Sequence, residues 1–229
     1  MAPMIKHVFF DAGNTLVYPN FTLVAEKLAA RGARVPVGEL ERGEQRARYL
    51  LDDPQVIRGS TDGARWLLYF ETIFKFCGVT DAPVVRNVLD ELQRIHKVSN
   101  LWEVVPPDVP PALEGLRGRF RLSVISNANG TVREKLRRVG LLDFFETVLD
   151  SHEEGIEKPD PRIFRNALER TGSRAEESLY VGDIYHIDVV GARAAGMEVV
   201  LLDPADLHGD KPVRRIRGLG DLASSIDAP

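Results

Sequence analysis

Strand and helix patterns alternate over the second half of this 229-residue chain. Short runs rich in valine, isoleucine and leucine are each followed by an amphipathic stretch. Strands are predicted at Leu122–Ile125, Thr147–Leu149, Leu179–Val181 and Glu198–Leu202, and helices at 111–118, 132–139, 161–170 and 188–195. This alternation indicates βαβ units, because parallel strands need a crossover connection. We therefore expect an α/β fold with a doubly wound parallel sheet, followed by an edge strand near 213–216 and a helix near Leu222.

The first half of the chain interrupts this pattern. A buried strand is predicted at Val8–Phe10, but from about Val17 to Val98 only helical periodicity is found. Candidate helices cover 21–31, 39–51, 61–77 and 82–95, the third capped by Ser60 or Thr61 and the fourth by Thr80 or Asp81. The proline-dense passage 102–111 should be neither regular helix nor central strand. We expect an all-helical domain, 17–98, inserted into an α/β domain made of 1–16 and 99–229.

Composition excludes several classes of protein. A net charge of −4 argues against a general nucleic-acid binder, which would carry a basic surface. No apolar run approaches the roughly 18 residues of a membrane span, and the N-terminal residues lack the features of a secretory signal. The single cysteine, Cys77, cannot form an internal disulfide. We expect a cytoplasmic protein, monomeric or homodimeric, that acts on a small molecule.

The first strand delivers a carboxylate to a loop. Asp11 directly follows the apolar run Val8–Phe10, and the loop continues through Gly13 to Thr15. In an open parallel sheet, ligands bind at the carboxyl ends of the strands. Asp11 is therefore a candidate catalytic residue.

Other predicted strands and connections bring polar residues to the same edge. Ser126 and Asn127 follow one strand, Asp183 and Asp188 follow another, and Lys158 lies in the connection after Leu149. Carboxylates that gather without a counterion are costly, and oxygen ligands suit hard divalent cations. We expect a site for an anion together with a metal ion, most simply Mg²⁺.

These residues, in this order, resemble the four motifs of the haloacid dehalogenase (HAD) superfamily of hydrolases. Asp11 to Thr15 is similar to the first motif, Ser126 to the second, Lys158 before Pro159 to the third, and Gly182-Asp183 with Asp188 to the fourth. The segment 191–197 resembles the sequence that follows the fourth motif. The helical stretch lies where subfamily I, and subfamily IA within it, carries its helical C1 cap. The resemblance spans nearly the whole chain and implies a Rossmann-like core.

The resemblance also implies roles for these residues. Asp11 would be the nucleophile that forms an aspartyl-phosphate, and Ser126 with Asn127 would bind the phosphoryl oxygens. Lys158 would neutralise the nucleophile and the phosphoryl group. Mg²⁺ would be held by Asp11, the Gly13 carbonyl and Asp183, with Asp188 supporting it through water or by orienting Lys158.

One position departs from the phosphatase pattern. HAD phosphatases carry a second aspartate, the general acid and base, two positions after the nucleophile, where this chain has Gly13. The neighbouring Asn14 is a neutral amide and cannot replace it. Loss of general acid catalysis should slow the hydrolysis of alkyl esters by about 10²- to 10⁴-fold. Acyl and aryl phosphates, whose leaving groups depart without a proton, would escape this loss.

Three alternatives therefore stay open beside a phosphatase that is weak or restricted to good leaving groups. A 2-haloacid dehalogenase also releases an unprotonated leaving group, but this family lacks the acid found at Asp183 and tends to have tyrosine where this chain has Phe164. A phosphonatase would need a specific cap lysine. A non-catalytic protein could keep the phosphate and Mg²⁺ site for binding or regulation.

Overall fold

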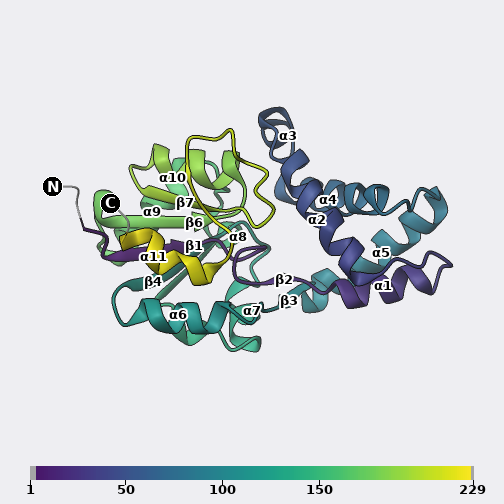
Figure 1. Cartoon of the computed structure of the whole chain (residues 1–229), viewed down its shortest axis with the longest axis horizontal. Helices are drawn as coiled ribbons and strands as arrows, with labels where there is room; N and C mark the ends of the chain where they lie inside the picture. Colours follow the sequence, from purple (N-terminus) through teal and green to yellow (C-terminus); the bar gives the residue numbers. More distant parts are fainter. Residues whose placement is uncertain (1–3, 228–229) are drawn as a thin grey trace. The chain divides into compact units, whose positions relative to one another are not determined.

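The computed structural model describes residues 4–227, and the chain divides into two compact units (Figure 1). One unit runs through Tyr18 and resumes at Val104, and the other is Pro19–Glu103. Both ends of the helical unit lie later in the chain than the expected 17 and 98. The reason is local: helix α5 (Ala82–Ser99) continues past Val98, and strands β2 (Tyr18–Pro19) and β3 (Trp102–Val104) pair where the chain crosses between units.

The first unit is built on a parallel sheet, which confirms the predicted fold class. Its described residues form six strands in the order β5-β4-β1-β6-β7-β8. Every neighbouring pair is parallel. The strands are β1 (His7–Phe10), β4 (Arg121–Ser126), β5 (Thr147–Asp150), β6 (Ser178–Gly182), β7 (Glu198–Leu202) and β8 (Arg214–Ile216). Because all these pairs are parallel, the carboxyl ends of the strands share one edge, and β1 lies inside the sheet between β4 and β6.

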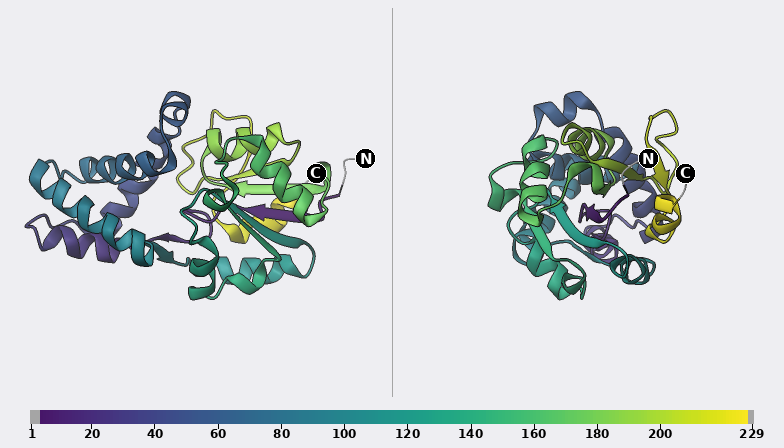
Figure 2. Two further views of the ribbon diagram at one scale, coloured as in Figure 1. Left: turned by 180° about the vertical axis from the view of Figure 1, so that it is seen from behind. Right: turned by 90° about the vertical axis from the view of Figure 1, so that its left-hand side faces the viewer.

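Strand β1 is completely buried because both faces of the sheet are covered. Phe9 packs in a core formed with α9 (Pro161–Thr171) and α10 (Val190–Ala194). Helices α6 (Val109–Arg117) and α11 (Leu222–Asp227) lie on the opposite face, as the end-on view in Figure 2 shows. Complete burial of a phenylalanine contributes about 1.5–3 kcal/mol, so β1 is firmly anchored. The remaining short helices of this unit are α7 (Val132–Arg138) and α8 (Ser151–Glu154).

The second unit contains helices with a core of their own. They are α1 (Phe21–Ala29), α2 (Val37–Leu51), α3 (Pro54–Gly59), α4 (Asp62–Phe76) and α5. Phe70 and Phe74 of α4 are completely buried among Leu40 of α2 and Leu92 of α5. The side chains of Thr61 and Asp81 accept hydrogen bonds from the first turns of α4 and α5, so two predicted caps are confirmed. No helix of the described part of the chain is both long and apolar enough to cross a membrane.

Several local predictions were wrong or incomplete. Helices α3 and α8 and strands β2 and β3 were not predicted, because two to six residues are too few to show a periodicity. Helix α6 begins at Val109, so Pro110 and Pro111 of the proline-dense passage are helical. They are tolerated because the first-turn N–H groups have no acceptor within the helix. The helix predicted at 188–195 starts instead as a π-helix over Tyr185–Val189, which continues into α10.

The amino end of β1 is fixed by a buried histidine. The His7 ring nitrogens lie 2.7 Å from the Ser173 hydroxyl and 2.9 Å from the Ser123 hydroxyl. Burial, reinforced by the positive charge of Arg121, lowers the pKa of His7 to about 3. Glu146 lies 3.7 Å from the ring but is paired with Arg121 at 2.7 Å, so it does not hold His7 in the charged form. His7 is therefore a neutral hydrogen-bonding group in the folded protein.

This arrangement predicts a pH-dependent stability. Between about pH 6.5 and 3, the unfolded chain binds a proton at His7 that the folded chain excludes, so stability is present above pH 6.5 and is lost as pH falls. From pH 7 to 4.5 the parent should lose about 1.5–2.5 kcal/mol more free energy of unfolding than His7→Asn, measured by urea titration. Ser178→Ala, which removes a buried hydroxyl beside His7 but no titratable group, offers a control and should keep the parental slope. Equal slopes for the parent and His7→Asn would contradict a neutral His7.

Candidate active site

Asp11 lies where β1 leaves its neighbour β4. The register with β4 ends at Phe10, opposite Val124, while the Asp11 N–H still donates to the Val181 carbonyl of β6 at 2.8 Å. The loop then turns back sharply, since the N–H groups of Leu16 and Val17 both donate to the Ala12 carbonyl. Asp11 is only 7% exposed, so its carboxylate is held at the sheet edge in a largely dry environment.

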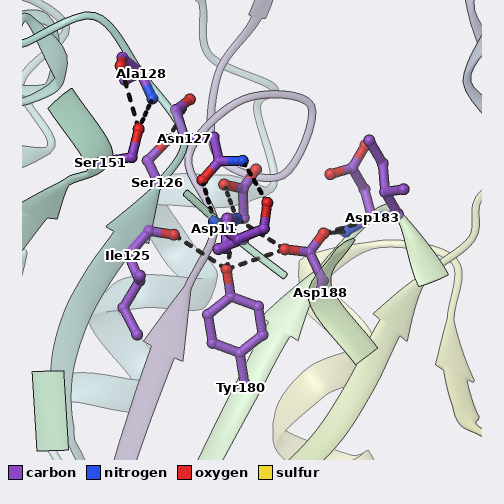
Figure 3. Close-up of polar contacts among 11 residues, drawn as sticks. Asp11, Ile125, Ser126, Asn127, Ala128, Ser151, Tyr180, Asp183 and Asp188 are labelled. Atoms are coloured by element: carbon purple, nitrogen blue, oxygen red, sulfur yellow. Dashed lines mark hydrogen bonds and ion pairs between the residues drawn. The ribbon is translucent and has the colours of Figure 1, made fainter. Parts of the chain in front are cut away.

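The Lys158 ammonium group connects the strand ends. It donates to Asp11 Oδ1 at 2.6 Å, to Asp188 Oδ1 at 2.8 Å and to the Tyr180 hydroxyl at 2.8 Å. All three partners converge in Figure 3, in which Asp11, Tyr180 and Asp188 face a common centre. Sequence reasoning anticipated both carboxylates but missed Tyr180. The available signal was a single polar-tipped side chain in the otherwise apolar run 179–181, just before Asp183.

Asp188 uses both of its carboxylate oxygens within the protein. Oδ1 accepts from Lys158 and lies 3.1 Å from the Tyr180 hydroxyl, while Oδ2 accepts from the backbone N–H groups of Asp183 and Ile184 at 3.0 Å each. A carboxylate engaged this way has little capacity left for a metal ion. Of the two predicted roles for Asp188, the arrangement favours orienting Lys158.

Burial and crowding dominate the electrostatics of this site. Burial raises the pKa of Asp11 to about 6; Asp188 adds to this rise and Lys158 opposes it. Burial alone would lower the pKa of Lys158, but the charges and hydrogen bonds of Asp11 and Asp188 raise it overall. Two carboxylates, from Asp11 and Asp188, thus face one ammonium group, and Asp183, whose backbone N–H binds Asp188, is buried as well. This excess of negative charge suits a bound cation.

The Asn127 side chain holds the backbone of Lys158. Its amide nitrogen donates to the Lys158 carbonyl at 3.0 Å, and its amide oxygen accepts from the Lys158 N–H at 2.8 Å. This side chain is therefore engaged in placing Lys158, and its predicted contact with a phosphoryl group stays a prediction. Ser126, at the end of β4, is 2% exposed, and its hydroxyl makes only a long contact of 3.4 Å with the Asn127 carbonyl. Of these two side chains, Ser126 is engaged in fewer hydrogen bonds within the protein.

Two glycines of the fourth motif region allow close packing around Lys158 and Asp188. A Cβ atom on Gly182 would lie 2.3 Å from Asp188 Cγ, and one on Gly191 would lie 2.6 Å from the Phe164 ring and 2.8 Å from the Pro159 carbonyl. Both distances are far below van der Waals contact. Glycine at these positions lets Asp188 and the segment after Lys158 reach their places.

The predicted metal site combines carboxylates with a backbone carbonyl. Within residues 4–227, no group of three or more His, Cys, Asp or Glu residues is close enough to hold a metal ion. The predicted set consists of Asp11, Asp183 and the Gly13 carbonyl as direct ligands with Asp188 in support, so it relies on a backbone oxygen as well as on carboxylates.

Comparison with known proteins decides the family. The sequence model of the haloacid dehalogenase-like hydrolases matches residues 5–196. The chain belongs to this family. The chain is 35% identical over 176 residues to haloacid dehalogenase-like hydrolase domain-containing protein 3 of Bos taurus, covering 74% of this chain and 70% of that protein. It is 33% identical over 200 residues to glyceraldehyde 3-phosphate phosphatase of Methanopyrus kandleri, covering 86% of this chain and 83% of that protein.

A solved structure also resembles this HAD hydrolase along its length. The crystal structure of 2-haloacid dehalogenase from Pseudomonas syringae pv. Tomato has a TM-score of 0.62 and 28% identity, and covers 98% of this chain and 99% of that one. The family resemblance drawn from the four motifs is thereby confirmed, as is the classification of the chain as a hydrolase.

The packing at Gly182 predicts a specific destabilisation. In Gly182→Ala the new methyl group would displace Asp188 from its backbone and Lys158 contacts, which should cost about 2–3 kcal/mol of unfolding free energy. Gly118→Ala is a matched control, because a Cβ there meets nothing within 4 Å and its φ is −71°. Adding Asp188→Ala to Gly182→Ala should cost less than the two single changes together, because the contacts with Asp188 Cγ and Oδ2 disappear and only the one with its Cβ, at 2.6 Å, is left. Urea unfolding measures all four variants, and strict additivity would count against the clash.

Proposed function

We propose that this HAD hydrolase is a Mg²⁺-dependent phosphatase-type enzyme that acts on a small phosphorylated molecule through Asp11. The observation that carries the proposal is the buried contact of 2.6 Å between the Asp11 carboxylate and the Lys158 ammonium group at the carboxyl edge of the sheet. A carboxylate paired with a fixed cation is suited to approach a phosphoryl group that is itself anionic. The phosphatase name of the Methanopyrus kandleri relative supports the same substrate class.

The proposed reaction has two displacements at phosphorus. In the first, an oxygen of Asp11 bonds to phosphorus, and the bond to the leaving group breaks with its electron pair departing on the leaving group. In the second, water attacks the aspartyl-phosphate, releasing inorganic phosphate and regenerating Asp11. Lys158 offsets negative charge at both stages, and the Ser126 hydroxyl donates to a phosphoryl oxygen.

The donor set fits a hard divalent cation. Two carboxylates, from Asp11 and Asp183, and one carbonyl, from Gly13, would hold Mg²⁺, while water completes its coordination. The bound ion supplies charge neutralisation and polarisation of the phosphoryl group. Asp188 acts by holding Lys158, since its oxygens already accept hydrogen bonds from the protein.

Gly13 restricts the range of leaving groups. No side chain follows Asp11 at the position that would protonate a departing alkoxide, and Asn14 does not exchange a proton near neutral pH. Acyl and aryl phosphates need no such proton. We further propose that Pro19–Glu103 is the C1 cap that selects the substrate, and that the enzyme works in the cytoplasm.

The proposed function predicts a metal-dependent activity that requires Asp11. Purified protein should release phosphate from acetyl phosphate and p-nitrophenyl phosphate with Mg²⁺ but not with EDTA, and Asp11→Asn should lower the rate by at least about 10³-fold because the nucleophile is lost. Asp227→Asn, an exposed carboxylate paired with Arg119, should keep the parental rate. Halide release from 2-chloropropionate that persists in EDTA would indicate a dehalogenase instead. Phosphate binding without any turnover would indicate a binding or regulatory protein.

Placing an acid at position 13 should widen the range of phosphate esters that the protein hydrolyses. In Gly13→Asp the rate on an alkyl phosphate such as glyceraldehyde 3-phosphate should rise by about 10²- to 10⁴-fold, because the new carboxyl group can protonate the departing alkoxide. The matched control is Gly13→Asn, which adds a side chain of the same size that cannot donate a proton usefully. The measurement is kcat/KM on the alkyl phosphate relative to acetyl phosphate. An equal gain in both variants would show that side-chain volume, not proton transfer, is responsible.

A further inference from the structure

Tyr180 completes the hydrogen bonding of Lys158. An ammonium group has three N–H donors and no acceptor, and Lys158 directs one toward each of Asp11, Asp188 and Tyr180 at 2.8 Å or less. Two of these acceptors are anionic carboxylates, and the third is a neutral phenol. The Tyr180 oxygen must therefore accept the bond from Lys158, which leaves its own proton for another partner.

The Tyr180 proton has two acceptors within reach. The phenol oxygen lies 3.0 Å from the Ile125 carbonyl and 3.1 Å from Asp188 Oδ1. Burial, followed by the charges of Asp188 and Asp11, raises the pKa of Tyr180 well above its ordinary value, so the phenol keeps its proton. Figure 3 shows the hydroxyl between Ile125 and Asp188. Since Ile125 directly precedes Ser126, this oxygen joins Lys158 to the strand that carries the serine.

The Tyr180 ring is held rigidly. The residue is completely buried, its backbone pairs with Phe9 of β1 and Val199 of β7, and its ring packs edge-on against Phe164 at 5.0 Å. The surrounding cluster is apolar, and a phenylalanine would fill the same space. A buried hydroxyl costs free energy unless it is bonded, so the three polar contacts of this oxygen account for its presence.

We propose that Tyr180 is a positioning residue of the active site: its phenol oxygen accepts the third N–H of Lys158 and fixes the ammonium group toward Asp11 and Asp188. The kinetic consequence of this role rests on the proposed phosphatase function, but the structural role does not. When the phenol is removed, the ammonium group loses one of its three acceptors and can tilt away from the nucleophile. The reaction step, more than substrate binding, should suffer.

Tyr180→Phe removes this oxygen alone. The ring stays, and with it the contact of the Lys158 nitrogen 5.4 Å from the ring centroid. The first measurement is nuclear magnetic resonance of the Lys158 side-chain N–H groups in ¹⁵N-labelled protein, assigned by their loss in Lys158→Met. We expect a slowly exchanging signal in the parent and exchange with water at least about tenfold faster in Tyr180→Phe. A parent without this signal, or an unchanged exchange rate in the variant, would overturn the proposal.

The second measurement is steady-state kinetics on acetyl phosphate with Mg²⁺. In Tyr180→Phe, kcat should fall about 10- to 100-fold, the usual effect of one hydrogen bond to a charged group, while KM stays within about threefold. The control is Ser178→Ala, which removes a buried hydroxyl at the amino end of the same strand, bonded to the Arg174 carbonyl and remote from Lys158; it should leave the Lys158 signal and kcat unchanged. A kcat within twofold of the parent would contradict the proposal.

If the proposed phosphatase function is wrong, the kinetic and exchange measurements give different answers. A parent protein without turnover on any phosphate would refute the phosphatase proposal, while the exchange rate of the Lys158 N–H groups would still decide the role of Tyr180. Thermal unfolding of each variant separates positioning from loss of fold, because a folded Tyr180→Phe with a reduced kcat and faster N–H exchange supports positioning.

Discussion

The buried charge of Lys158 is the interaction on which the rest of the site depends. Asp11 and Asp188 both lie within 2.8 Å of its nitrogen, and Asp188 and Lys158 are almost completely excluded from water. Removing one partner of a buried ion pair typically costs about 3–5 kcal/mol, whereas replacing the whole set by apolar side chains can be neutral or stabilising. A chain selected for stability alone would not keep this arrangement. Its presence in an otherwise well-packed core is best explained by chemistry at Asp11.

The fold brings these charges together by the geometry of the parallel sheet. Strand β1 carries the nucleophile candidate, and its two neighbours β4 and β6 end beside it with Ser126 and Asp183. Lys158 is not on a strand, and its place is set by other means. Asn127 bonds both backbone groups of Lys158, and Gly191 lets helix α10 approach Pro159 closely. The long side chain of Lys158 is thus positioned by the contacts of its own backbone and by the three acceptors around its ammonium group.

The sequence was informative wherever a pattern was local or repeated. The parallel sheet followed from strand and helix alternation, and the candidate site residues were inferred from polar groups after the strands and in one connection. The saturation of Asp188, the clamp made by Asn127 and the role of Tyr180 could not be predicted. The clamp and the role of Tyr180 depend on hydrogen bonds between residues far apart in the chain, such as Ile125 and Tyr180, and Asp188 is saturated only when the distant Lys158 adds to its local bonds. Helix α3 and the π-helix at Tyr185–Val189 were missed because periodicity is not readable over five or six residues.

The insertion of the helical unit after β1 has a consequence for synthesis of the chain. Strand β1 is made first, yet its partners β4 and β6 begin only at Arg121 and Ser178. The whole of Pro19–Glu103, with its own buried core, is synthesised before either partner strand. Pairing of β1 must await these distant segments, and closing such long loops is entropically slow. The apolar run Val8–Phe10 therefore stays unpaired while the whole helical unit is made, and during that interval it is exposed to wrong contacts.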